Sequence, residues 1–160
     1  MLLRLLTVFI REAVAEAIFG DFSPSGKLPV TFYQGTENLP EFTDYDMSDR
    51  TYRYTDKNVL YPFGYGLHYG TIRYENAQIS CAQCSVRDAV DVSVDVINES
   101  SYTIHESVQA YIQHEEADAY EPGYQLKGIQ TVTLQPKETK RVTISLKVRD
   151  FAIITQEGEC

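Results

Sequence analysis

Four carboxylates lie close together at Glu115, Glu116, Asp118 and Glu121, and clustered carboxylates could form a general acid–base pair or bind Ca²⁺. Their spacing does not match the calcium-binding loop of an EF-hand. The cluster also lies between two segments that are predicted to be strands. The sequence therefore predicts a solvated acidic loop at this position rather than a catalytic or metal site.

Cys81 and Cys84 have the Cys-x-x-Cys spacing that is found in zinc sites and in redox-active proteins. A zinc site would need two further ligands, and a redox motif would lie at the start of a helix that follows a strand. Neither context is predicted here. Cys160 brings the number of cysteines to three, and an odd number argues against a disulfide framework. We therefore expect reduced or incidental thiols near the start of a strand.

Other residue types that commonly carry catalysis are present without the spacing that catalysis requires. No serine lies in a nucleophile-elbow motif, and residues 20–26 lack the pattern of a phosphate-binding loop. The histidines are scattered along the chain, at His68, His105 and His114. The residues by themselves predict no catalytic site, no metal and no cofactor.

Residues 44–53 form the one segment in which this chain could contact a small polar substrate. The segment combines carboxylates, guanidinium groups and an aromatic ring, at Asp44, Asp46, Arg50, Tyr52 and Arg53. Such groups hydrogen-bond to hydroxyls and stack on rings. The favoured interpretation is a salt-bridged clamp between two domains, because the surrounding residues are rich in aromatics. The alternation in residues 50–54 predicts an extended segment with Tyr52 and Tyr54 on one face.

Length and composition indicate one globular domain, or a small domain with part of another. The chain has 160 residues, of which 43% are hydrophobic, and a formal net charge of −9. This charge opposes binding to nucleic acid and to anionic lipid surfaces. No stretch approaches the roughly 20 apolar residues of a membrane span. Neither nucleic acid nor a membrane is therefore expected as a partner.

Residues 1–33 are predicted to form a helix, a tight turn and a short strand. Apolar residues recur on one side of the first segment at helical spacing, with charged residues opposite, which favours an amphipathic helix over a signal peptide. The helix is expected to end near Phe19 with Gly20 as its left-handed cap, and residues 28–33 to form the strand. One such step cannot bury both of its faces, so this segment is interpreted as the remnant of an α/β domain.

Residues 34–68 are predicted to be an irregular, aromatic-rich connecting segment rather than a flexible linker. At its end, residues 60–69 combine four Phe/Tyr rings with one proline and two glycines. The glycines permit a positive φ or a close backbone approach, and the proline fixes its own φ. We therefore expect a sharply bent hinge at which two domains dock. The docking residues are Tyr61, Pro62, Phe63, Tyr65 and Tyr69.

Residues 69–160 are predicted to form strands, because apolar and polar residues alternate with a period of two. The clearest runs are residues 90–96, 108–112, 125–134 and 142–148. This pattern is typical of an antiparallel β-sandwich of the immunoglobulin or fibronectin type III class. We count about five strands where such a sandwich usually has about seven, which predicts an incomplete domain.

Three groups of motifs resemble the C-terminal part of glycoside hydrolase family 3, which contains β-glucosidases and β-xylosidases. Residues 17–32 resemble the end of that family's α/β sandwich domain, and residues 60–69 resemble the entry into its fibronectin type III-like domain. Residues 126–130 and 136–140 resemble paired signatures of the latter domain. The similarity covers about residues 12–157. Residues 1–11 depart from it, and the family's domain would continue with further strands after Gly158, so both ends are expected to be cut short.

The resemblance implies retaining hydrolysis of a β-linked glucoside or xyloside by a longer parent enzyme, with one carboxylate as nucleophile and another as acid/base. In the family both carboxylates precede the region that this chain matches, so no catalytic residue is transferred to it. The implied partners are the substrate of the parent enzyme and the missing N-terminal catalytic domains. The chain alone is predicted to be inactive and to contribute scaffold and domain docking.

Two alternatives stay open from the sequence. The chain could be an autonomous β-sandwich module that binds carbohydrate or protein, a reading favoured by its 12 tyrosines and weakened by the absence of tryptophan. It could also be an inactive fragment from a broken reading frame. Such a fragment would expose unpaired strand edges and would tend to aggregate.

Overall fold

The computed structural model describes residues 2–55, 59–113 and 121–152, with side chains from Arg11 onward. Helix α1 (Leu2–Phe19) comes first, followed by the short helices η1 (Thr36–Asn38) and α2 (Thr51–Tyr54) of the connecting segment. Strands β1 to β5 and the short helix η2 (Val148–Phe151) complete the described chain. None of the described helices is long and apolar enough to cross a membrane.

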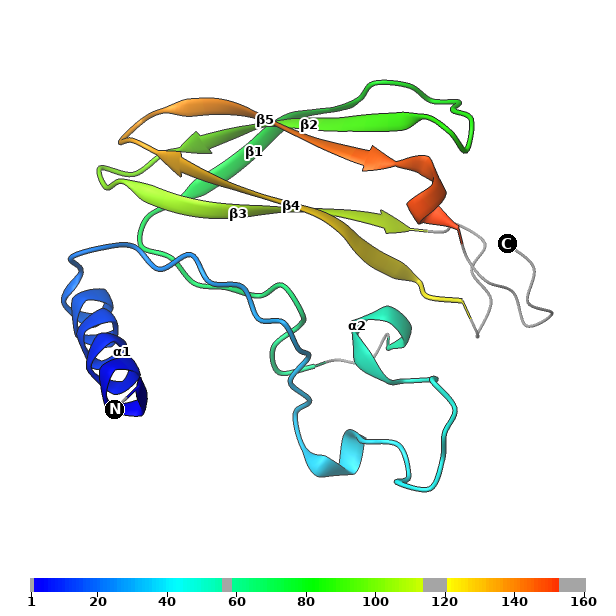
Figure 1. The fold of residues 1–160 in the computed structure, drawn as a ribbon, viewed down its shortest axis with the longest axis horizontal. Coiled ribbons are helices and arrows are strands. Elements are labelled where there is room, and N and C mark those ends of the chain that lie inside the picture. Colours follow the sequence, from blue (N-terminus) through cyan, green and yellow to red (C-terminus); the bar gives the residue numbers. More distant parts are fainter. Residues whose placement is uncertain (1, 56–58, 114–120, 153–160) are drawn as a thin grey trace.

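The strands form two antiparallel layers that face each other (Figure 1). One layer has the order β1 (Ile72–Ile79), β2 (Ala89–Asn98) and β5 (Thr139–Lys147). The other layer pairs β3 (Ile104–Gln113) with β4 (Tyr124–Leu134). The predicted antiparallel sandwich, with five strands in the described part of the chain, is therefore confirmed.

The core lies between the layers because each strand presents one apolar face to it. Val96, Ile104 and Leu134 are fully buried there, and alternate residues of β5 complete the core with Val142, Ile144 and Leu146. The polar residues between them point outward, as a period of two requires. Burial of such side chains contributes roughly 1.5–3 kcal/mol each, which is the main stabilisation of the sandwich.

A register shift between Ala110 and Tyr111 marks an irregularity in the pairing of β3 with β4. Gly128 lies opposite Ala110, and Leu126 lies opposite Tyr111, so Lys127 is the extra residue of a bulge. At Gly128 the backbone lies very close to the other layer. A Cβ atom there would lie 2.9 Å from Leu146 Cδ2 and closer still to Ile144 Cγ2, so this position accommodates only glycine without movement of the core.

The N-terminal segment agrees with the prediction for the helix but not for the strand. Helix α1 ends at Phe19, and Gly20 follows with a φ of 83°, which confirms the predicted left-handed cap. Residues 28–33 do not form a strand; the only regular pairing of this part of the described chain is a single bridge between Phe32 and Tyr61.

The reason lies in a turn of the facing segment. Leu28 and Phe32 both hydrogen-bond to the backbone of residues 60–65, with N···O distances of 2.8 Å to Tyr65 and Tyr61. Between these two contacts the Tyr65 N–H turns back to the Pro62 carbonyl oxygen at 3.1 Å, with Gly64 at a φ of 79°, so a continuous ladder cannot form. The two segments are extended and antiparallel, but they touch at two points instead of along a strand.

Cys81 and Cys84 form a disulfide in the turn between β1 and β2, so the prediction of reduced thiols was wrong. The turn places the two Cα atoms 6.5 Å apart, which lies within the range that a disulfide can bridge. The spacing of the two cysteines did not reveal this pairing, because the geometry of the turn decides it.

We expect Gly128→Ala to lower the free energy of unfolding by about 1–3 kcal/mol, because the added methyl group would force Ile144 and Leu146 to move. Urea denaturation followed by circular dichroism measures this change. Gly26→Ala is the matched control, since a Cβ atom at Gly26 would meet no atom within 4 Å. Equal stabilities of the two variants would contradict the close approach of β4 to β5.

Candidate functional site

An aromatic cluster fastens the connecting segment to the outer face of the β3–β4 layer. Tyr52 of α2 stacks on Phe63, with ring centroids 4.0 Å apart and an interplanar angle of 13°. Tyr111 of β3 and Tyr124 of β4 meet the Tyr52 ring edge-on, at 6.4 and 5.4 Å. The Leu126 N–H also donates to Tyr52 Oη at 3.1 Å. The segment is therefore held by ring packing and by a hydrogen bond to a strand.

Glycines allow the backbone of residues 60–69 to approach this layer closely. Gly64 has a φ of 79°, and a Cβ atom there would lie 2.6 Å from Tyr111 Oη and 2.7 Å from Gln109 Oε1. At Gly66 a Cβ atom would lie 2.5 Å from the carbonyl oxygen of Gly26. The sharp bend expected of this run is present, and both glycines are required for the contacts that it makes.

Hydrogen bonds at Tyr69 tie the same run to the N-terminal part of the chain. Its N–H donates to Ser23 Oγ at 2.9 Å, and its hydroxyl donates to the Ala17 carbonyl oxygen at 2.7 Å. Ser23 is buried although it is polar, and this bond satisfies its hydroxyl. The end of α1 is thereby fixed to the start of the sandwich.

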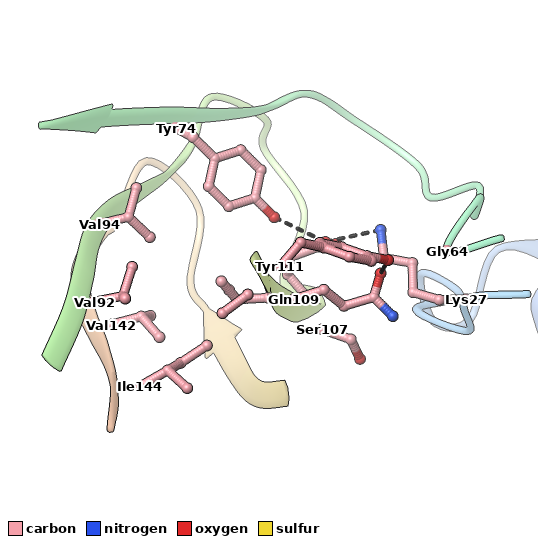
Figure 2. Close-up of a pocket in the computed structure, with 13 residues that line it drawn as sticks. Lys27, Gly64, Tyr74, Val92, Val94, Ser107, Gln109, Tyr111, Val142 and Ile144 are labelled. Atoms are coloured by element: carbon pink, nitrogen blue, oxygen red, sulfur yellow. Dashed lines mark hydrogen bonds and ion pairs between the residues drawn. The ribbon is translucent and has the colours of Figure 1, made fainter. Parts of the chain in front are cut away.

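A buried ion pair joins the N-terminal segment to the sandwich (Figure 2). Lys27 Nζ lies 2.8 Å from Glu106 Oε1 of β3, and the Glu106 side chain is only 4% exposed. Tyr74 of β1 donates its hydroxyl to the same oxygen at 2.9 Å. Burial raises the pKa of Tyr74, and the negative charge of Glu106 raises it further. Three separate segments of the chain therefore meet at one carboxylate.

Comparison with known proteins assigns the N-terminal and C-terminal parts of the chain to two known domain types. The profile of the Glycosyl hydrolase family 3 C-terminal domain matches residues 10–69, and that of the Fibronectin type III-like domain matches residues 106–160. A β-xylosidase of Formosa agariphila is 35% identical over 151 residues, which cover 91% of this chain and 21% of the relative.

The chain belongs to glycoside hydrolase family 3.

Further members of family 3 agree over the same region. A periplasmic β-glucosidase of Salmonella typhimurium is 32% identical over 158 residues, which cover 91% of this chain and 21% of the relative. The crystal structure of a β-glucosidase from Erythrobacter marinus superposes with a TM-score of 0.75 at 35% identity, covering 92% of this chain and 20% of that protein. This chain spans about one fifth of these relatives and corresponds to their C-terminal portion.

The five residues proposed for substrate contact do not form one site in this family 3 chain. Asp44, Asp46 and Arg50 organise an exposed loop: Asp46 N–H donates to Asp44 Oδ1 at 2.9 Å, and Arg50 Nε donates to the Asp46 carbonyl oxygen at 2.9 Å. A second nitrogen of Arg50 donates to the Asp44 carbonyl oxygen. Within the described part of the chain, Arg50 therefore donates to backbone carbonyl oxygens rather than to the carboxylates that a salt-bridged clamp would use.

Hydrogen bonds from the Ser48 backbone and hydroxyl lower the pKa of Asp46 and hold this loop in shape. Tyr52 instead faces the sandwich, and the Arg53 guanidinium lies 5.9 Å above its ring. Residues 51–54 form the helical turn α2, so the predicted extended segment was wrong. A hydrogen bond from the Thr55 N–H to the Thr51 carbonyl oxygen closes this turn.

Of the five predicted docking residues, Phe63 packs against Tyr111 of the sandwich, whereas Tyr61, Tyr65 and Tyr69 contact residues of the N-terminal segment. These contacts are together termed the joint. Phe63 is half-buried in the aromatic cluster, and Tyr61 contacts Phe32 edge-on and Tyr65 at 5.1 Å. Tyr61, Tyr65 and Tyr69 keep 38–43% of their surface exposed, and Pro62 is also exposed. One side of the joint thus rests on the sandwich while the other remains open.

Acidic residues and metal ligands do not gather into a further site in the described ranges. Glu115, Glu116 and Asp118 lie outside the described residues, and Glu121 follows them at the start of the next described segment. Within residues 11–55, 59–113 and 121–152, no group of three or more His, Cys, Asp or Glu side chains could hold a metal ion.

The sequence did not reveal the buried ion pair of Lys27 with Glu106 or the Tyr74 hydroxyl that donates to the same carboxylate. A signal for Glu106 was present, because it occupies an inward position of an alternating strand between Ile104 and Val108. A carboxylate at such a position needs partners. Which residues provide them depends on where the N-terminal segment and β1 lie relative to β3, and that is a property of the tertiary structure.

We expect Phe63→Ala to lower the free energy of unfolding by about 2 kcal/mol, because it removes a stacked, half-buried ring from the joint. Chemical denaturation followed by tyrosine fluorescence measures the change. Tyr45→Ala is the control, since Tyr45 is 90% exposed and its loss is expected to change stability by less than about 0.5 kcal/mol. An equal effect of both substitutions would show that the joint is not packed.

The stability of the folded chain is expected to depend on pH through Tyr74. Its pKa is higher in the folded chain than the usual value of 10.0, so the folded state holds its proton more tightly than the unfolded state. This contribution to stability is fully present below about pH 10 and is lost as the pH rises further. In urea denaturation at increasing pH, the free energy of unfolding is expected to fall less for Tyr74→Phe than for the unaltered chain. Equal falls for the two chains would contradict this role of Tyr74.

Proposed function

We propose that this chain is the C-terminal scaffold and docking portion of a retaining β-glycosidase that hydrolyses terminal, non-reducing β-glucosides or β-xylosides. The observation that carries the proposal is the joint, in which α1 and the connecting segment are fastened to the sandwich by the aromatic cluster and by Tyr69. Such a joint sets the position of one domain relative to another, which is a mechanical role that needs no catalytic residue.

Apolar side chains on the N-terminal side of the joint support docking to a further domain. Ile18 and Phe19 at the end of α1 are 70% and 83% exposed, and Phe22, which lines the same hollow, is 39% exposed. Large apolar side chains that lie together on a surface are usually covered by a partner. The partner that we propose is the N-terminal, catalytic part of the parent enzyme.

Catalysis in the parent enzyme would use two carboxylates about 5–5.5 Å apart, one as nucleophile and one as acid/base. We propose that this chain contributes neither of them. Any contact of this chain with the substrate would be made at the margin of the parent enzyme's active site, through the exposed loop of Asp44, Asp46 and Arg50. The bonds within this loop leave the two carboxylates accessible to hydroxyl groups of a sugar.

Complementation tests the proposal. The chain alone is expected to release no nitrophenol from aryl β-glucosides or β-xylosides. Mixing it with the Formosa agariphila β-xylosidase from which the matching C-terminal region has been removed is expected to restore hydrolysis. Phe19→Asp is expected to lower the restored activity about tenfold, because it places a charge in the proposed interface.

Val86→Asp is the matched control for this experiment, since Val86 is 68% exposed in the turn between β1 and β2, away from the joint. Hydrolysis by the chain alone, or complementation that is equally weakened by both substitutions, would overturn the proposed docking role. Saturable binding of xylo- or cello-oligosaccharides to the isolated chain would favour an autonomous carbohydrate-binding module instead.

A further inference from the structure

Two extended segments, residues 23–32 and 60–69, are joined to each other and are here termed the docking ribbon. The Leu28 N–H donates to the Tyr65 carbonyl oxygen at 2.8 Å, and the Gly64 N–H donates to the Leu28 carbonyl oxygen at 2.8 Å. A bridge joins the two segments again further along. The docking ribbon therefore behaves as one body, and its position on the sandwich depends on the contacts that it makes with the strands.

Ring packing holds the docking ribbon against the β3–β4 layer, but it does not define a single register. Phe63 stacks on Tyr52 of α2 and meets Tyr111 of β3 edge-on, with ring centroids 6.5 Å apart in the second pair. Aromatic pairs are stable in several arrangements and over several ångströms, so these rings tolerate sliding and tilting. A directional contact is needed to fix the ribbon at one position along β3.

Lys27 of the docking ribbon makes such a contact with Glu106 of β3. Its Nζ atom lies 2.8 Å from Glu106 Oε1, and charge-assisted hydrogen bonds of this kind weaken steeply when distance or angle changes. The stem of Lys27 passes beside Gly66, where an added Cβ atom would lie 2.9 Å from Lys27 Cδ. The opposite segment of the ribbon therefore confines the lysine on its way to the carboxylate.

The carboxylate of Glu106 is held in place from the other layer of the sandwich. Tyr74 of β1 donates its hydroxyl to Glu106 Oε1 at 2.9 Å, and the Glu106 side chain is 4% exposed. Lys27 and Tyr74 reach this oxygen from different elements of the chain (Figure 2). Because the carboxylate is buried and held by Tyr74, it cannot turn to follow a displaced lysine. The sandwich thus presents a fixed acceptor to the ribbon.

Stability alone does not account for an ion pair at this place. Desolvation of two charges offsets most of their attraction, so a buried pair adds little net stability compared with apolar side chains of the same size. Loss of one partner is different, because it leaves the other charge buried and uncompensated. Lys27 is 19% exposed and Glu106 is 4% exposed, so desolvation applies to both. The pair therefore suits a role in which it selects one arrangement of the ribbon.

We propose that Lys27 and Glu106 are positioning residues that fix the orientation of the docking ribbon on the sandwich. The end of α1 follows the ribbon, because Tyr69 holds both Ser23 and the Ala17 carbonyl oxygen. The orientation within this chain does not depend on the proposed glycosidase function. Its consequence for catalysis rests on that function, because the ribbon would transmit the position of the sandwich to the catalytic part of the parent enzyme.

Residual dipolar couplings of the ¹⁵N-labelled chain measure this orientation. One alignment tensor is expected to describe the amides of both the docking ribbon and the strands in the unaltered chain. Lys27→Met with Glu106→Leu replaces the ion pair by apolar side chains of similar size. In this double variant the couplings of the ribbon are expected to shrink at least about twofold relative to those of the strands. The urea midpoint is expected not to fall, which separates loss of position from loss of stability.

Three further variants complete the comparison. Lys27→Arg keeps the charge and the donors, and its ribbon and strands are expected to share one tensor again. Lys147→Met removes a lysine that is exposed at the end of β5 and is expected to change neither the couplings nor the urea midpoint. If the double variant does not fold, Glu106→Gln, which keeps the shape of the side chain and removes its charge, provides the same test of the couplings.

Complementation of the truncated Formosa agariphila β-xylosidase tests the consequence for catalysis. The double variant is expected to restore a kcat about tenfold lower than the unaltered chain does, at an unchanged KM, whereas Lys27→Arg restores the full value. Failure of the unaltered chain to complement would contradict the proposed function alone, because the couplings are measured without the parent enzyme.

Two results would overturn the inference itself. The first is a folded double variant, or Glu106→Gln variant, in which the ribbon and the strands still share one tensor with undiminished couplings. The second is a double variant whose urea midpoint falls in proportion to its couplings, because the ion pair would then stabilise the fold instead of selecting the position of the ribbon.

Discussion

Val96, Ile104 and Leu134 are fully buried between the two layers, and their packing is the contact on which the rest of the structure depends. In β2 and β5 the apolar residues recur at every second position, so the apolar face of this layer is removed from water only when the other layer packs against it. Every other feature is attached to this core. The aromatic joint rests on the outer face of β3 and β4, and those strands keep their shape because their inner faces are buried.

The joint is the physical basis of the scaffold role that we propose for this chain. Tyr52 and Phe63 stack on each other and meet Tyr111 of β3 edge-on, and Tyr69 holds the last turn of α1, so the N-terminal segment has a defined position relative to the strands. In an enzyme of several domains, a small error in position at the reacting centre is costly. A rigid C-terminal support is therefore the contribution to catalysis that we propose, and it needs no nucleophile, base or metal ligand.

Local sequence was sufficient for features that depend on one segment alone. The two-residue period of residues 90–96 and 142–148 specified the strands, and Gly20 specified the end of α1, because each follows from backbone geometry and side-chain alternation. The bend at Gly64 was also predictable. These parts of the fold could therefore be read from the sequence.

Features that depend on two distant segments were decided only by the tertiary structure. Residues 28–33 look like a strand, but the segment opposite them turns at residues 62–65, and this turn interrupts the ladder. The disulfide of Cys81 and Cys84 depends on the shape of a turn, and the partners of Glu106 come from residues 79 and 32 positions before it. Spacing along the chain determines which face a side chain takes; only the folded chain determines what lies opposite that face.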